Sequence, residues 1–130
     1  MNILIDTQIA LWGLYNDKKL PESSSGLLRD LRNNIYVSLV SAWEIEIKHS
    51  LGKLDVSSDS FIRDSEAIGF CLLPVKKEHI LALKALPYPD NGHKDPFDRL
   101  LIAQAESEGF SFLSEDSRIL DYDRSCIIRG

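Results

Sequence analysis

The sequence predicts one α/β domain with three layers, α/β/α, in which helices cover both faces of a central, mostly parallel sheet of about five short strands. Short apolar runs alternate with segments of helical periodicity along the whole chain. This alternation indicates βαβ units, whose strands pair in parallel. The length of 130 residues suits a single domain, and the chain has no internal repeat or low-complexity tract. We therefore treat residues 1–130 as one domain.

The first quarter of the chain predicts one strand and two helices. The run NILI within 1–5 is typical of a short buried strand, and the apolar positions of QIALWGL indicate a helix over 7–15. Charged residues, a proline and a run of serines predict a loop over 16–26. The body of the second helix is expected over 27–33.

The middle of the chain continues this alternation. β-branched and aromatic residues predict a strand over 35–39. Apolar residues then recur at i, i+4 and i+8 and stop before a glycine, which predicts a helix over 41–51. An amphipathic helix, also ended by a glycine, is expected over 57–68, and a third strand over 70–75.

The last third contains the most apolar helix. A short helix is expected over 78–86, and a loop with two prolines and an Asn-Gly pair over 87–94. Residues 96–108 predict a helix that is apolar over most of its circumference and is therefore central. The final strands, and the short helical stretch between them, are expected at 110–113, 126–128 and 117–120.

The composition is that of an ordinary soluble globular protein, with 44% hydrophobic and 27% charged residues. No apolar stretch approaches the roughly 20 residues of a membrane span, and Asp6 interrupts the segment where a secretory signal would lie. We expect a cytoplasmic protein in which Cys71 and Cys126 are reduced core thiols. The net charge of −5 argues against broad attraction to nucleic acid. It does not exclude a nucleic-acid substrate, because clustered active-site acids contribute to that total.

Four acids lie at the ends of short apolar runs, far apart in sequence: Asp6, Glu44, Asp98 and Asp116. Parallel strands end at the same edge of a sheet, which is where ligands bind in folds of this kind. Four carboxylates at that edge would form an all-oxygen site, which suits Mg²⁺ or Mn²⁺ better than Zn²⁺. Such an ion supports hydrolysis of a phosphodiester bond by activating water.

Each acid also has a structural explanation as a helix cap. Asp6 and Asp116 each precede a predicted helix, and Ser41 with Glu44 has the spacing of a capping box. Asp95 is best interpreted as the cap of the helix that begins at Pro96. Carboxylates that served only as caps would repel one another at one edge of a sheet, whereas a cation would neutralise them. The residue types alone leave both interpretations open.

Competing catalytic motifs are missing from the sequence. No Ser-His-Asp or Cys-His arrangement is evident, and His49, His79 and His93 have no recognisable nucleophile partner. The seven glycines are isolated, so no phosphate-binding loop is present.

Longer motifs resemble a known family. The stretches LIDT, SAWEIEIKHSLGKL, HKDPFDRLLIAQA and LSEDSRI are similar, in this order, to those of PIN-domain ribonucleases, and most closely to VapC-type toxins of toxin–antitoxin systems. The resemblance implies a PIN-like fold and metal-binding acids at Asp6, Glu44, Asp98 and, more variably, Asp116. It also implies endonucleolytic cleavage of RNA with Mg²⁺ or Mn²⁺, a homodimer, and a cognate antitoxin that blocks the active site.

Four further residues are candidates for substrate contact: Thr7, Lys48, Arg99 and Ser114. Thr7 and Ser114 match polar residues near the site in the family. Lys48 lies one helical turn from Glu44 and could equally be a solvated surface lysine. Arg99 follows Asp98 and could instead steady a neighbouring acid through an ion pair.

The two alternative functions are a phosphate-receiver signalling domain and a catalytically silent binding module. A phosphate-receiver signalling domain has a similar size and an acidic Mg²⁺ pocket, but it needs an Asp after a central strand, and the 70–75 run lacks one. A catalytically silent PIN-like binding module would keep the fold without the reaction, and the intact set of acids argues against it.

Overall fold

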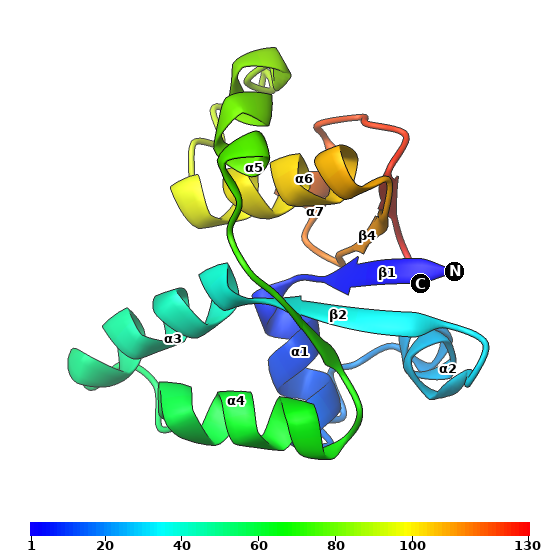
Figure 1. Ribbon diagram of the computed structural model, residues 1–130, viewed down its shortest axis with the longest axis vertical. Coiled ribbons are helices and arrows are strands. Elements are labelled where there is room, and N and C mark those ends of the chain that lie inside the picture. Colours follow the sequence, from blue (N-terminus) through cyan, green and yellow to red (C-terminus); the bar gives the residue numbers. More distant parts are fainter.

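The computed structural model describes residues 1–130 and confirms the three-layer α/β/α architecture (Figure 1). The sheet has five strands in the order β3-β2-β1-β4-β5, and every neighbouring pair is parallel. The strands are β1 Asn2–Ile5, β2 Asn34–Ser38, β3 Cys71–Leu73, β4 Ser111–Leu113 and β5 Ile127–Ile128. β1 is central, so the strand order reverses on either side of it, and the carboxyl ends of β1, β2 and β4 meet at one edge.

Seven α-helices and one 3₁₀ helix cover the sheet. They are α1 Thr7–Leu14, α2 Glu22–Arg29, α3 Leu39–Ser50, α4 Ser58–Ala67, α5 Lys77–Ala82, η1 Leu83–Ala85, α6 Pro96–Glu108 and α7 Ser117–Leu120. In Figure 1, α1 and α4 lie on one side of the sheet, whereas α5 and α6 lie on the other. None of the helices combines the length and the apolar character needed to cross a membrane.

The sheet separates two hydrophobic cores. Ile3 and Ile5 of β1 pack into the core on the α1 and α4 side, whereas Leu4 packs into the core under α6. β4 divides in the same way, with Leu113 in the first core and Phe112 in the second. This alternation follows from the two-residue period of a strand, and it explains why the strands are continuous apolar runs.

Two helix starts differ from the sequence prediction. α2 begins at Glu22 and ends at Arg29, so the serines expected in a loop are helical, whereas residues 30–33, expected in the helix, are not. Burial of Ser24, which donates a hydrogen bond to Glu115, outweighs the weak helix propensity of the serine run. α3 begins at Leu39 because Ser38, not Ser41, caps it by accepting a hydrogen bond from the backbone N–H of Val40.

The predictions for β3 and the cysteines also need correction. β3 has only three residues, and the expected strand over 70–75 is cut short by Pro74, which has no N–H to donate to a neighbouring strand. Cys71, expected in the core, is exposed on this edge strand. Cys126 is only partly buried, against the core under α6, and both cysteines are free thiols.

Candidate functional site

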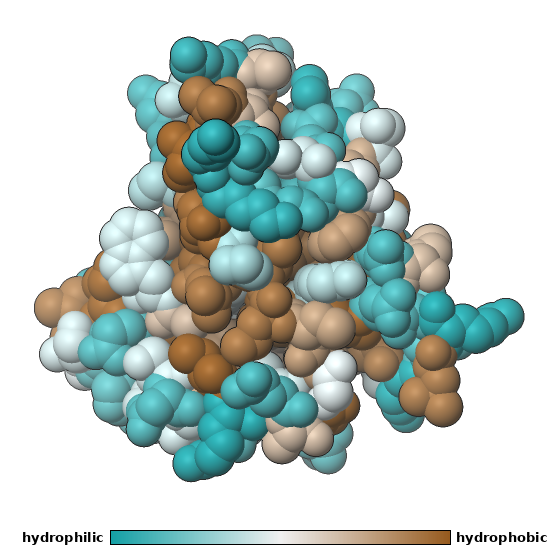
Figure 2. All heavy atoms as spheres, in the orientation of Figure 1, coloured by the Kyte–Doolittle hydropathy of each residue, from teal (hydrophilic) through white to brown (hydrophobic).

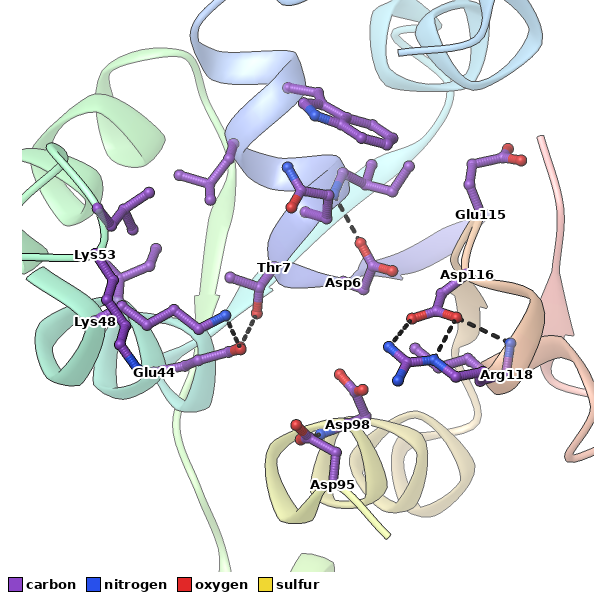
Figure 3. Close-up of a pocket in the computed structure, with 17 residues that line it drawn as sticks. Asp6, Thr7, Glu44, Lys48, Lys53, Asp95, Asp98, Glu115, Asp116 and Arg118 are labelled. Atoms are coloured by element: carbon purple, nitrogen blue, oxygen red, sulfur yellow. Dashed lines mark hydrogen bonds and ion pairs between the residues drawn. The ribbon is translucent and has the colours of Figure 1, made fainter. Parts of the chain in front are cut away.

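The four acids converge on one cavity of about 560 Å³ at the carboxyl edge of the sheet (Figure 3). Asp6 follows β1, Glu44 comes from α3, Asp98 from the first turn of α6, and Asp116 from the segment after β4. In Figure 3 the side chains of Asp6, Asp98 and Asp116 point toward the middle of the cavity, and Glu44 approaches from the opposite side. The parallel topology therefore brings together residues more than a hundred positions apart.

Asp6 is the most buried of the four acids, with 5% of its surface exposed. It caps α1, as predicted, by accepting a 2.7 Å hydrogen bond from the N–H of Ile9. Its other carboxylate oxygen accepts a 2.6 Å bond from the hydroxyl of Ser114. Burial raises its pKa from 3.8 to about 7 despite these two bonds, and the charges of Asp98 and Asp116 add to the rise. Asp6 is thus held in place but poorly solvated as an anion.

Glu44 is not part of a capping box, because α3 begins five residues before it. It lies in the second turn of α3 with 7% of its surface exposed. The Thr7 hydroxyl lies 2.8 Å from one of its oxygens, and the Lys48 ammonium lies 2.9 Å from the other. The capping box predicted for Ser41 and Glu44 is therefore wrong. Glu44 nevertheless lines the same cavity as the other three acids.

Asp98 belongs to a hydrogen-bonded chain that the sequence did not reveal. Asp95 caps α6, as predicted, by accepting a bond from the N–H of Asp98. The Asp98 carboxylate lies 3.0 Å from His93 Nε2, and His93 Nδ1 lies 2.8 Å from the Tyr122 hydroxyl. Burial, together with the charges of Asp95 and Glu44, raises the pKa of Asp98 to about 6, although the hydrogen bond and the charge of His93 oppose the rise. The sequence shows no nucleophile partner for His93, and the structure pairs it instead with an acid five residues later.

Asp116 is the most solvated of the four. It caps α7 through the N–H of Arg118, and the Arg118 guanidinium lies 3.1 Å from its second oxygen. Burial tends to raise the pKa of Asp116, but the hydrogen bonds and charge of Arg118 outweigh burial and lower it. Arg118 also lines the cavity and was not among the predicted site residues.

The residues predicted to contact substrate have different positions. Thr7 and Lys48 line the cavity, and both bond to Glu44. Ser114 is fully buried behind Asp6, so it supports that carboxylate and cannot touch a substrate.

Arg99 does not form the ion pair with a neighbouring acid that the sequence left open. Its guanidinium turns away from the acids and donates hydrogen bonds to the carbonyl oxygens of Leu86 and Pro87 and to the hydroxyl of Tyr122. Arg99 therefore neither lines the cavity of the four acids nor pairs with an acid.

The donor set fits a hard divalent cation. All four acids offer carboxylate oxygens, and each raised pKa has a neighbouring acid among its causes, so the charges are close enough to repel. No group of three His, Cys, Asp or Glu side chains is arranged closely enough to hold an ion in this conformation. Instead, each acid bonds to a protein group: Ser114, Thr7 with Lys48, His93 or Arg118.

Known structures share this fold over nearly its whole length. VapBC2 from Rickettsia felis, bound to a DNA fragment from its promoter, is 14% identical, with a TM-score of 0.71 over 100% of this chain and 98% of that one. VapBC-1 from nontypeable Haemophilus influenzae is 16% identical, with a TM-score of 0.67 over 100% and 97%. FitAcB from Neisseria gonorrhoeae is 14% identical, with a TM-score of 0.63 over 97% and 96%. At these identities the likeness concerns the fold.

The sequence itself identifies the family. A comparison with curated protein sequences found no match. The family model described as PIN domain matches residues 3–125, a span that includes all four acids and ends just before β5. This match excludes the alternative that the chain is a phosphate-receiver signalling domain. The chain belongs to the PIN domain family.

Proposed function

We propose that this protein is an Mg²⁺- or Mn²⁺-dependent endoribonuclease. The observation that carries the proposal is the convergence of Asp6, Glu44, Asp98 and Asp116 on one cavity, with the pKa values of Asp6 and Asp98 raised. PIN domains are generally nucleases. A cluster of repelling carboxylates is costly to the fold unless a cation offsets it, so the cluster indicates a function.

Different residues of this site would bind the metal ion, orient its ligands and contact the substrate phosphate. Asp6, Glu44, Asp98 and Asp116 would hold the metal ion, which when bound lowers the pKa of water and stabilises charge on a phosphate. Asp6 and Asp98, whose pKa values are raised, would have to be deprotonated to serve as ligands, so the metal affinity would fall at low pH. Ser114, Thr7 and His93 fix the carboxylate orientations through the hydrogen bonds given above. Lys48 and Arg118 keep positive charge at the cavity, where a substrate phosphate would lie.

The test is cleavage of single-stranded RNA by the purified chain, freed of any partner protein. We expect cleavage with Mg²⁺ or Mn²⁺ and none with EDTA. Asp6→Asn and Asp98→Asn should each abolish it, because an amide is a poor ligand for a hard cation. Asp59→Asn on α4 removes the same charge from an exposed acid outside the cavity and serves as the matched control. Full activity in either cavity variant would contradict the assignment.

We further propose a toxin role with a cognate antitoxin as partner. The solved structures that share the fold include complexes named VapBC, and another from Klebsiella pneumoniae is described as a toxin–antitoxin complex. Expression of the wild type should arrest growth of a bacterial host, whereas Asp6→Asn should not. Growth that is unaffected by a catalytically active wild type would refute the toxin role and leave the nuclease role intact.

A homodimer is the last part of the proposal. An exposed apolar stripe runs along α3 and ends at its C-cap. It consists of residues that recur every four positions: Leu39, Trp43, Ile47 and Leu51. A single stripe on a helix suits a twofold contact, in which the same surface serves both copies. Analytical ultracentrifugation should give a dimer for the wild type and a monomer for Trp43→Glu. A monomeric wild type would rule out this assembly.

A further inference from the structure

A second cavity, of about 580 Å³, lies beside the loop over 87–94 and the first turn of α6. Eight residues line it, and they include three cations, Lys84, Lys94 and Arg99, and no acid. Tyr88 is the only aromatic residue among them. In a chain with a net charge of −5, an acid-free cavity with three cations requires an explanation.

The distribution of ion pairs sharpens this contrast. Of the 15 Lys and Arg residues, eight form salt bridges with carboxylates and seven do not. Three of those seven line this cavity. Three cations without a salt bridge thus line a cavity that contains no acid, which favours an anionic ligand.

Arg99 gives the strongest indication. Its surface is only 6% exposed, yet no carboxylate contacts it. Two carbonyl oxygens and a hydroxyl supply its hydrogen bonds, at 2.8 to 3.3 Å. These groups carry only partial charges, and a buried cation without a counter-ion is costly to the fold. A phosphate in the adjacent cavity would supply the missing negative charge.

Tyr88 adds a surface suited to a base. The guanidinium carbon of Arg99 lies 3.7 Å from the centroid of the Tyr88 ring, so one face of the ring is covered by a cation. The residue is nevertheless 63% exposed. Proteins that bind single-stranded nucleic acids stack the bases on exposed aromatic rings and contact the phosphates with nearby cations.

The two cavities share the first turn of α6. Asp95 and Asp98 line the acidic cavity, whereas Lys94, Pro96 and Arg99 line the basic one. Successive residues of a helix point about 100° apart, which directs Asp98 and Arg99 into different cavities. A strand cut at the acids can therefore continue over this turn into the basic cavity.

We infer that the basic cavity binds one nucleotide of the RNA strand next to the cleaved bond, with Lys84 and Lys94 contacting phosphate and Tyr88 stacking on the base. The inference rests on the proposed function. It gives the strand a defined path away from the acids, which themselves repel phosphate.

The test measures binding of fluorescent single-stranded RNA to the full chain in EDTA, where no cleavage occurs, over a series of salt concentrations. Each phosphate contact with a single strand contributes about 0.7 to the slope of log K against log salt. The double variant Lys84→Ala/Lys94→Ala should therefore lower the slope by about 1.4. Lys18→Ala/Lys19→Ala removes the same charge from exposed lysines that form no salt bridge and lie outside both cavities, and should leave the slope unchanged.

Tyr88 variants test the stacking contact separately. Tyr88→Ala should weaken RNA binding by about 5-fold to 150-fold with little change in slope, because stacking contributes roughly 1–3 kcal/mol per base. Tyr88→Phe should bind as the wild type does, because it keeps the aromatic face.

Three outcomes would overturn the inference. Equal slopes for the two double variants would show that the basic cavity takes no RNA phosphate, even if the wild type cleaves RNA. Binding of inorganic phosphate or of an acidic peptide that depends on Lys84 and Lys94, without any effect on RNA, would assign the cavity to another ligand. A wild type that neither binds nor cleaves RNA would overturn the proposed function together with this inference.

Discussion

Asp6→Asn is expected to stabilise the fold while it destroys the proposed activity. Asp6 is buried beside other acids, and its pKa is raised from 3.8 to about 7. A carboxyl with a raised pKa binds its proton more tightly in the folded state than in the unfolded chain. Its contribution to stability is therefore complete below about pH 4 and is lost as the pH rises through about 7.

The magnitude follows from the size of the rise. A change of one pKa unit corresponds to about 1.4 kcal/mol, so the ionised carboxylate costs the folded state up to about 4 kcal/mol above pH 7. Asparagine resembles the neutral carboxyl, and its amide oxygen can still accept the bond from the Ile9 N–H. Solvent penetration and relaxation reduce such effects, so we expect a gain of about 1–2 kcal/mol at about pH 8.

Urea denaturation of both proteins in EDTA, at about pH 5 and about pH 8, measures this difference. The advantage of Asp6→Asn should be larger at the higher pH, because only there is the wild-type carboxylate fully ionised. A variant less stable than the wild type at the higher pH, or a difference that does not change with pH, would refute the reasoning. It would mean that Ser114 and Ile9 compensate for burial of the charge.

Three further predictions concern the surroundings of the acids. Mn²⁺ at about a hundred times its dissociation constant should stabilise the wild type by about 2.7 kcal/mol in thermal unfolding, whereas Asp98→Asn should gain far less, and EDTA should reverse the effect. His93→Asn should weaken Mn²⁺ binding by about 10-fold to 100-fold in calorimetry, because it removes the group that orients Asp98; unchanged affinity would make His93 a packing residue only. Arg99→Met should lower the free energy of unfolding by about 3 kcal/mol, because it leaves the carbonyl oxygens of the loop without a donor; a loss below about 0.5 kcal/mol would show that the loop does not depend on Arg99.

The elements that the sequence predicted best have complete local signals. α6 matches its predicted range, because Asp95, Pro96 and Gly109 supply the cap, the first helical residue and the left-handed end. α7 matches as well, with Asp116 as its cap. Where the local signal was ambiguous, tertiary contacts decided. Both Ser38 and Ser41 can cap a helix, and the structure uses Ser38, which moves Glu44 into the second turn.

The sequence by itself determined which acids were candidates and that Asp6, Asp98 and Asp116 lie at the starts of helices. Those features depend on neighbours a few residues away, because caps and strand ends are local. Only the tertiary structure decided the partners: His93 for Asp98, Tyr122 for His93, Ser114 for Asp6, and two carbonyl oxygens for Arg99. Most of these contacts join residues that are far apart in the chain, and they depend on how the strands are ordered in the sheet. The spacing of residues along the chain does not reveal the order of the strands in the sheet. The sequence alone therefore could not identify Arg99 as a support of the basic cavity.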